Sequence, residues 1–316
     1  MNVLDWVLDS DPAIRWQAMR DLAEAAPEAI AAERARIATE GWGARLLALQ
    51  GDDGQWEGGA LFPARRPGRV DGKWPGGQPW TATAYSLVLL RDLGIDPHCD
   101  AMRRAVAQVR ENCRWEHAGQ PFFSGEVEPC INGMVVVLGS YFGQDVDAVV
   151  ARLIEEQLED GGWNCEAENG SVHSSFHTTI RVLEGLLAYE RAKGGGAAEC
   201  RAARRRGKEY LLERKLFRRK STGAVVNPAW LEFSFPARWH YDVLRALDYF
   251  REAGDPPDPR MDEAIGLLRA KRQPEGFWLL ENTHPGAVHF ALEDGDGKPS
   301  RWNTLRALRI LRWYGQ

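Results

Sequence analysis

The chain has 316 residues, 44% of them hydrophobic, and a formal net charge of −5. These values allow a sizeable core in one large domain. They disfavour a nucleic-acid binder, whose binding face would be basic. We interpret the local basic run at 201–208 as a solvated helix face, with a phosphate or membrane patch as the alternative.

We expect no targeting signal in this sequence. The N-terminal residues Met-Asn-Val-Leu-Asp-Trp lack the basic and apolar runs of a signal peptide. No apolar stretch approaches the roughly 20 residues that span a bilayer. Five scattered cysteines are typical of a reducing compartment. We therefore expect a cytoplasmic protein without a transmembrane segment, in which a cysteine is a core residue, a metal ligand or a nucleophile.

The N-terminal region predicts a helical hairpin. Residues 11–24 have Ser10 or Asp11 as a helix cap, Pro12 in the first turn and apolar residues at helical spacing. Residues 28–50 supply the second arm of the hairpin. We expect residues 1–41 to cap the repeats of residues 42–316, because a terminal repeat has to hide an apolar end.

One segment recurs along the chain: a Gly/Asp/Trp turn, followed by a helix that opens at an aromatic or small residue. The turns lie at 50–56, 157–163 and 273–278, and they end in Trp56, Trp163 and Trp278. The helices open at Trp80, Cys130, Phe176, Trp239 and Trp302, which are 46 to 63 residues apart. A period of this size predicts a repeat architecture.

The helices of the repeats are of two kinds. Segments such as 102–109 and 146–158 have a partial apolar face, whereas the segments that follow the starts named above are apolar along their length, at 82–90, 134–138, 180–188, 243–250 and 305–313. An inner ring of buried helices within an outer ring of amphipathic helices explains the difference. The sequence therefore predicts an all-α fold.

Tryptophan is abundant, and its positions suggest two roles. We interpret Trp56, Trp163 and Trp278 as staples that pack each turn against the next repeat. Trp80, Trp239 and Trp302 begin inner helices, so their rings belong either to the core or to a central pocket. We expect that pocket to be lined by inner-helix starts, with Phe176 among them, and an aromatic lining binds apolar or cationic groups.

The Gln-x-x-x-Gly-x-Trp turns and the inner helices after them resemble the repeats of squalene–hopene cyclases and of protein prenyltransferase β-subunits. The resemblance covers roughly residues 42–316. It implies an α/α toroid, here with an N-terminal helical hairpin. It also implies that an apolar or isoprenoid-like small molecule occupies a central cavity. The turns are structural, so they indicate the fold better than the function.

A zinc site is implied by the resemblance to the prenyltransferases. Phe176-His177-Thr178 resembles the segment that carries their zinc-binding His, and Glu128-Pro-Cys130 resembles their Asp-x-Cys. Glu128, Cys130 and His177 are therefore the candidate metal ligands, with Cys165, His173 and Glu126 as replacements. Carboxylate, thiolate and imidazole groups bind zinc well, and three protein ligands leave a fourth position open. Alternatively, Cys130 is a core residue and His177 bonds to the backbone.

The sequence departs from the prenyltransferases at the groups that hold the diphosphate. Phe122 and Gly125 stand where the family has Arg and Lys, and Ile131 stands where it has Tyr. A diphosphate would have to be held elsewhere. The arginines near inner-helix starts are candidates, namely Arg181, Arg238, Arg245 and Arg301.

The cyclases' acid motif, Asp-x-Asp-Asp, is missing. Asp242 lies near the expected place of such an acid and is read either as an alternative acid or as a helix cap. His240 is a second catalytic candidate. Three hypotheses stay open: a zinc-assisted transferase or lyase, a metal-free terpene cyclase that uses Asp242 or Glu128, and a non-catalytic toroid that binds a lipid, a peptide or a protein. The sequence leaves open whether the chain is an enzyme.

Overall fold

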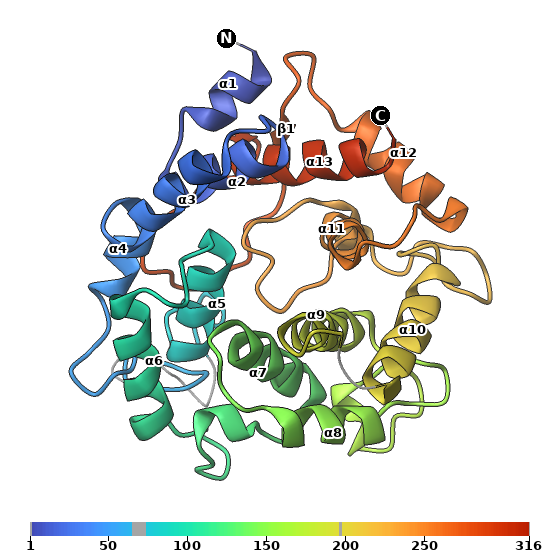
Figure 1. The fold of residues 1–316 in the computed structure, drawn as a ribbon. Coiled ribbons are helices and arrows are strands. Elements are labelled where there is room, and N and C mark those ends of the chain that lie inside the picture. The colour runs from blue at the N-terminus through green and yellow to red at the C-terminus, as the bar shows by residue number, and fades with distance from the viewer. Residues whose placement is uncertain (1, 65–73, 196–197, 316) are drawn as a thin grey trace.

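The computed structural model describes residues 2–64, 74–195 and 198–315, and it is built almost entirely of helices (Figure 1). The α-helices are α1 Val3–Leu8, α2 Pro12–Asp21, α3 Pro27–Ala35, α4 Gly41–Leu47, α5 Thr83–Leu93, α6 Asp100–Asn112, α7 Pro129–Tyr141, α8 Asp147–Glu155, α9 Phe176–Ala192, α10 Ala198–Leu212, α11 Val243–Ala253, α12 Asp262–Ala270 and α13 Arg301–Trp313. Short 3-10 helices lie at Arg36–Ala38, Phe122–Ser124, Cys165–Ala167, Pro228–Leu231 and Pro259–Met261. Two short strands, β1 Trp278–Leu279 and β2 Pro299–Ser300, pair antiparallel with Trp278 opposite Ser300. The predicted all-α class is confirmed.

The helices form two rings (Figure 1). Helices α5, α7, α9, α11 and α13 surround the centre, and α4, α6, α8, α10 and α12 lie outside them. The segment that leads into α11 crosses the middle of the ring. The α/α toroid is thereby confirmed. In the part of the chain that is described, no helix has the length and apolar character required to cross a bilayer.

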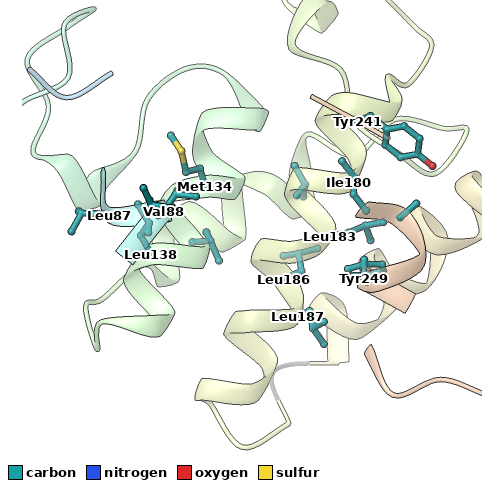
Figure 2. Close-up of a cluster of buried hydrophobic side chains, with 14 of the residues drawn as sticks. Leu87, Val88, Met134, Leu138, Ile180, Leu183, Leu186, Leu187, Tyr241 and Tyr249 are labelled. Carbon is teal, nitrogen blue, oxygen red and sulfur yellow. The ribbon is translucent and has the colours of Figure 1, made fainter. Parts of the chain in front are cut away.

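Burial explains why the two kinds of helix differ in sequence. Every residue from Ile131 to Gly139 of α7 is buried, so the whole circumference of this inner helix has to be apolar or small. The outer helix α6 buries only Met102, Ala105, Val106 and Val109, one stripe at helical spacing. Inner helices contribute apolar side chains to one buried core, and Figure 2 draws several of them, among them Leu87, Met134, Leu138, Leu183 and Leu186.

The N-terminal hairpin packs against the C-terminal helix. Asp11 caps α2 by accepting from the backbone N–H of Ala13 at 2.9 Å, which selects Asp11 from the two predicted caps. The Arg309 guanidinium of α13 donates to Gln17 Oε1 and to Asp21 Oδ2 of α2, both at 3.0 Å. These bonds join the two ends of the chain and close the ring.

The three turn tryptophans repeat one geometry. Trp56, Trp163 and Trp278 are completely buried. Their indole N–H groups donate to carbonyls of the preceding outer helices, at Leu46 (2.8 Å), Leu153 (2.6 Å) and Leu268 (2.7 Å). Their backbone N–H groups donate to threonines of the following inner helices, at Thr83 (3.2 Å), Thr179 (3.0 Å) and Thr304 (2.9 Å). Each turn therefore ties an outer helix to an inner one, as the sequence predicted.

Helices α7 and α9 approach each other so closely that their backbones touch. A Cβ atom placed on Gly133 would lie 2.8 Å from the carbonyl oxygen of Arg181, and one on Gly185 would lie 2.6 Å from the carbonyl oxygen of Gly133. Glycine is required at both positions because any side chain would push the two helices apart. This contact sets how far apart the first turns of α7 and α9 lie.

Candidate metal centre and central cavity

Three potential zinc ligands meet beside the start of α7. Ligand atoms of Glu128, Cys130 and Cys165 all lie within 4.8 Å of one another, and no other group of three such residues occurs in the described part of the chain. The Cys130 thiol donates to Glu128 Oε2 at 3.3 Å. Cys165 Sγ lies 3.4 Å from Thr178 Oγ1, on the first turn of α9. We call these three residues the thiol cluster.

Local hydrogen bonds position the thiol cluster. The Asn132 side chain donates to the carbonyl of Glu126 and accepts from its N–H, both at 2.8 Å, which holds the segment before α7. Pro129 occupies the first turn of the helix, where a missing N–H is harmless. On the other side, Asn164 caps the short helix that begins at Cys165 by accepting from the Glu166 N–H at 3.0 Å. Both cysteines are therefore presented from fixed backbone.

The two thiols share a hydrogen bond that separates their acidities. This bond, together with burial, raises the pKa of Cys130 well above its ordinary value. The same bond, followed by the one with Thr178, lowers the pKa of Cys165 against the effect of burial. Cys165 is thus the more acidic thiol of the pair. Two cysteine sulfurs and a carboxylate at this separation fit a tetrahedral zinc site with one open position.

The sequence placed His177 in the metal site, and the structure puts Cys165 in that third position instead. His177 Nδ1 accepts a hydrogen bond from the Tyr241 backbone N–H at 2.8 Å, and its ring packs edge-on against Trp230 and Trp239. Burial lowers the pKa of His177 to about 4. Cys165 was among the predicted replacements, whereas the other two, Glu126 and His173, lie outside the group.

A cavity of about 550 Å³ lies within the ring. Ten arginines and four carboxylates line it among the described residues, together with apolar side chains such as Val88 and Leu89. The lining reaches from the segment 235–238 and Tyr85 at one end to Gly94 and Ala192 at the other. It therefore follows the inner helices from their first turns to their C-terminal ends. We call this space the arginine cavity.

The lining differs from the predicted aromatic pocket. Of the four expected aromatic residues only Trp302 lines the arginine cavity. Phe176 is buried against Tyr210, Trp230 and Tyr241. Trp80 donates to the carbonyl of Pro285 at 2.9 Å, and Trp239 is 40% exposed and stacks on His240. Helices α5 and α11 begin at Thr83 and Val243, so Trp80 and Trp239 lie in the preceding loops.

Three of the four predicted anion-binding arginines line the cavity: Arg181, Arg238 and Arg245. The fourth, Arg301, instead donates to the carbonyl of Trp6 at 3.1 Å. Glu184 accepts from Arg181 at 3.0 Å and from Arg245 at 2.7 Å. Burial opposes ionisation of this carboxyl, but the two guanidinium groups hold its pKa at about 2.

The cavity and the thiol cluster are separate regions. Glu128, Cys130, Cys165 and His177 do not line the cavity. Tyr85 does, and its phenol is close enough to Cys130 to interact with it electrostatically. The cluster therefore lies beyond the end of the cavity at which Tyr85 lies.

Asp242 and His240, the two candidate catalytic residues, make contacts within the protein. Asp242 caps α11 by accepting from the Arg245 N–H at 2.7 Å, and its other oxygen accepts from the Ser234 hydroxyl at 2.7 Å. His240 stacks on His284 with 3.8 Å between ring centroids, and burial lowers its pKa to about 3. Neither residue lines the arginine cavity.

Several cavity residues escaped the sequence analysis, notably Arg91, Arg306 and Arg309. All three lie on inner helices and line the cavity. The available signal was the presence of cations inside otherwise apolar helices, since a long charged side chain is rarely buried without a partner or a ligand.

Comparisons with known proteins give only distant likenesses. No protein-family model matches the chain, and no curated protein matches it. Among solved structures, a protein from Actinoplanes is 16% identical, with a TM-score of 0.44 over 97% of this chain and 91% of that one. The type II terpene cyclase MstE from Scytonema, in complex with geranylgeranyl dihydroxybenzoate, is 15% identical, with a TM-score of 0.33 over 89% of this chain and 94% of that one. A second MstE structure with this substrate gives the same identity and TM-score over 88% and 95%. These likenesses are too weak to assign a function to the chain.

Proposed function

We propose that the protein is a zinc-assisted enzyme of the terpene cyclase or prenyltransferase kind, a transferase or lyase whose metal is held by Glu128, Cys130 and Cys165. The observation that supports it is the convergence of these three ligand groups within 4.8 Å. Two thiolates and one carboxylate suit zinc, and the open fourth position is the arrangement of catalytic sites. Bound zinc would supply a Lewis acid, or would lower the pKa of a water or thiol that occupies the open position.

The chain's own residues prepare the cluster for a cation. Cys130 lies in the first turn of α7, where the partial positive charge of the helix N-terminus stabilises a thiolate. Thr178 Oγ1 lies beside Cys165 Sγ and steadies the second sulfur. Both cysteines would bind a metal as thiolates, so metal binding would release thiol protons. A reducing compartment is part of this proposal, because an oxidised pair could not bind the metal.

The proposed substrate is an isoprenoid-like small molecule. Aromatic rings lie close to the thiol cluster: His177, next to Thr178 in sequence, packs against Trp230 and Trp239. Trp239 is exposed by 40% and offers an apolar face to solvent. An apolar chain would lie against that face and would bring its reactive end toward Cys165.

Metal analysis tests the site. Protein purified without added zinc is expected to hold about one zinc per chain, and Cys130→Ala or Cys165→Ala should abolish binding without changing the circular dichroism spectrum. Cys99→Ala is the matched control, because Cys99 is a half-buried cysteine outside the thiol cluster. Wild-type protein that binds no metal, even when zinc is supplied, would contradict the proposal.

A turnover assay separates an enzyme from a toroid that only binds. Incubation with isoprenoids and isoprenoid diphosphates, followed by mass spectrometry, should reveal a product that Cys165→Ala does not form. Binding without product would favour the non-catalytic reading. For the metal-free cyclase, Asp242 is the weaker of the two proposed acids, because both of its oxygens already accept hydrogen bonds within the protein. Glu128 is assigned here to the metal site instead.

A further inference from the structure

We infer that the arginine cavity binds a small, multiply charged anion, either phosphorylated or polycarboxylic. The inference is independent of zinc, because no residue of the thiol cluster lines this cavity. The first argument is charge. The chain as a whole has a net charge of −5, whereas the described lining residues comprise ten arginines and four carboxylates, an excess of six positive charges. Such a concentration of like charge within a fold is costly unless an anion offsets it.

The carboxylates of the lining are already shared among several arginines. Glu184 pairs with both Arg181 and Arg245. Asp248 lies 2.8 Å from Arg251, 3.4 Å from Arg306 and 3.7 Å from Arg309. Three more carboxylates take part: Asp92 pairs with Arg91, Glu252 with Arg191, and Asp21, which lies outside the lining, with Arg20 and Arg309. Five carboxylates therefore pair with arginines of the lining, and about half of the guanidinium charge has no counterion among the described residues.

Arg238 is the clearest unpaired group. Among the described residues its guanidinium makes no ion pair and no hydrogen bond, and it lies 5.5 Å above the ring of Trp80. Its backbone is held in the left-handed region, with φ of 55°, and its carbonyl accepts a hydrogen bond from Arg181. The position of the residue is therefore fixed, while all five donors of its side chain stay available to a ligand.

Four buried polar atoms of lining residues also have no partner within the described structure: Ser140 Oγ, Tyr249 Oη, Trp302 Nε1 and Arg309 Nε. Buried polar atoms in proteins nearly always have a hydrogen-bond partner. All four can donate, and the two nitrogen atoms can only donate, so a group that satisfies all of them has to be an acceptor. An anion rich in oxygen atoms meets this requirement.

The shape of the cavity gives the direction of entry. Tyr85, Arg181 and Trp302 are buried at one end. At the other end the side chains of Arg20 and Arg191 are 45% and 53% exposed. A ligand therefore enters where α9 ends, past these two arginines, and travels toward Arg238. The volume of about 550 Å³ is in the range of small-molecule sites.

Guanidinium groups recognise both phosphate and carboxylate through paired hydrogen bonds, so both sources of charge fit the cavity. The competing explanation is that the arginines serve only the protein. Arg34, for example, donates to the carbonyls of Gly94 and Ile95 at the end of α5. That role requires no ligand, and a binding experiment separates the two explanations.

Isothermal titration calorimetry at low salt, with inorganic pyrophosphate and with citrate, tests the inference. Wild-type protein is expected to bind at least one of them saturably with a 1:1 ratio, and the tighter binder identifies the chemistry. Arg238→Gln should weaken that binding by about tenfold or more, because it removes a charge-assisted hydrogen bond. Arg110→Gln, an exposed arginine of the outer helix α6, is the control and should stay within about twofold.

Two further variants remove ambiguity. Arg238→Lys keeps the positive charge but lacks the planar guanidinium group with its paired N–H donors, so it should bind the anion with intermediate affinity. This variant also covers the case in which Arg238→Gln does not fold. Cys165→Ala, which lacks the proposed metal site, should bind the anion as tightly as wild type, so a failure of the zinc proposal is distinguishable. The inference is overturned if neither anion binds, or if Arg238→Gln and Arg110→Gln bind equally well.

Discussion

The rim formed by the N-terminal ends of the inner helices and the cavity that these helices enclose carry different chemistry. At the N-terminal ends lie thiols, aromatic rings and the imidazoles of His177, His240 and His284, whose pKa values burial lowers to about 4, 3 and 4. These imidazoles are therefore uncharged near neutral pH. Behind this rim, the cavity is lined by arginines along the length of the helices, from Arg181 and Arg245 near their starts to Arg91 and Arg191 near their ends. Since the same repeated turn builds both regions, the turn does not decide their chemistry.

Helix polarity bears on the rim. The N-terminus of a helix carries a partial positive charge and favours a thiolate. It does not explain Arg181 and Arg245, which lie in the N-terminal halves of α9 and α11 and pair with Glu184. We call the rim the N-terminal end and the arginine cavity the cavity end. We expect the two ends to function independently of each other, whereas both depend on the stability of the helix ring.

The largest loss of stability is expected when a turn tryptophan of the helix ring is removed. Trp163→Ala removes a completely buried indole and its hydrogen bond to Leu153, so the free energy of unfolding should fall by about 3–5 kcal/mol. Both ends should then lose function together, in proportion to the unfolded fraction measured by urea denaturation. Trp239→Ala, at a 40% exposed position, should cost less than about 1 kcal/mol. An equal loss of unfolding free energy in the two variants would show that Trp163 does not hold the turn against the neighbouring helices.

Removing a carboxylate should affect the cavity end alone. Glu184→Gln leaves Arg181 and Arg245 buried without their shared anion, at a cost of roughly 3 kcal/mol, and it should leave zinc content unchanged. Glu213→Gln, at an exposed pair with Lys220, is the control and should cost at most about 1 kcal/mol. Pyrophosphate should raise the melting temperature of the Glu184 variant more than that of wild type. Zinc loss in this variant would contradict the independence of the two ends.

Acid should weaken the N-terminal end first. The folded pKa values of the three histidines lie below the ordinary 6.5, so the unfolded chain takes up protons first as the pH falls. Their contribution to stability is complete above pH 6.5 and is lost toward pH 4, by about 1–3 kcal/mol in total. Glu184, with a pKa of about 2, adds a second loss below pH 4.5.

Urea midpoints measured across this range check the expectation. His240→Phe should flatten the dependence between pH 6.5 and 4. Half-buried Glu293, whose pKa desolvation raises to about 7, acts in the opposite sense, because the folded form holds its proton between pH 4.5 and 7. Glu293→Gln should therefore steepen the acid loss. A pH-independent midpoint in wild type and in both variants would refute the assignment.

The smallest effect is expected at Asp242. Asn is as good a helix cap as Asp, so Asp242→Asn should change the free energy of unfolding by less than about 1 kcal/mol, whereas Asp242→Ala should cost about 1–2 kcal/mol. Because we assign Asp242 to capping, the Asn variant should keep any turnover that the wild type shows. A folded Asn variant without turnover would revive the metal-free cyclase hypothesis.

The sequence predicted the fold because the signals were local. The turn tryptophans and the apolar helices repeat at a regular spacing, and each inner helix was located to within a few residues. Glu128 and Cys130 were found because they are neighbours at a helix start. Cys165 was ranked behind His177, because the sequence does not show that the turn at Trp163 folds back toward α7.

The arginine cavity lay beyond sequence reasoning for a related reason. Arg91 and Arg306 are far apart in the chain and belong to helices that are otherwise typical of an apolar core. Only the closure of the ring brings their guanidinium groups to one space. A single arginine in an apolar helix has many explanations. Only the three-dimensional structure shows that several such arginines face the same space.

The glycine contact between α7 and α9 acts as a pivot for the thiol cluster. Gly133 lies three residues beyond Cys130, about 4.5 Å along the helix axis, and touches the backbone of α9. A methyl group at the pivot would therefore spread the first turns of both helices almost rigidly. Cys130 and Thr178 would move apart, although neither had been altered. Metal affinity would then report on a contact between two residues that possess no side chain.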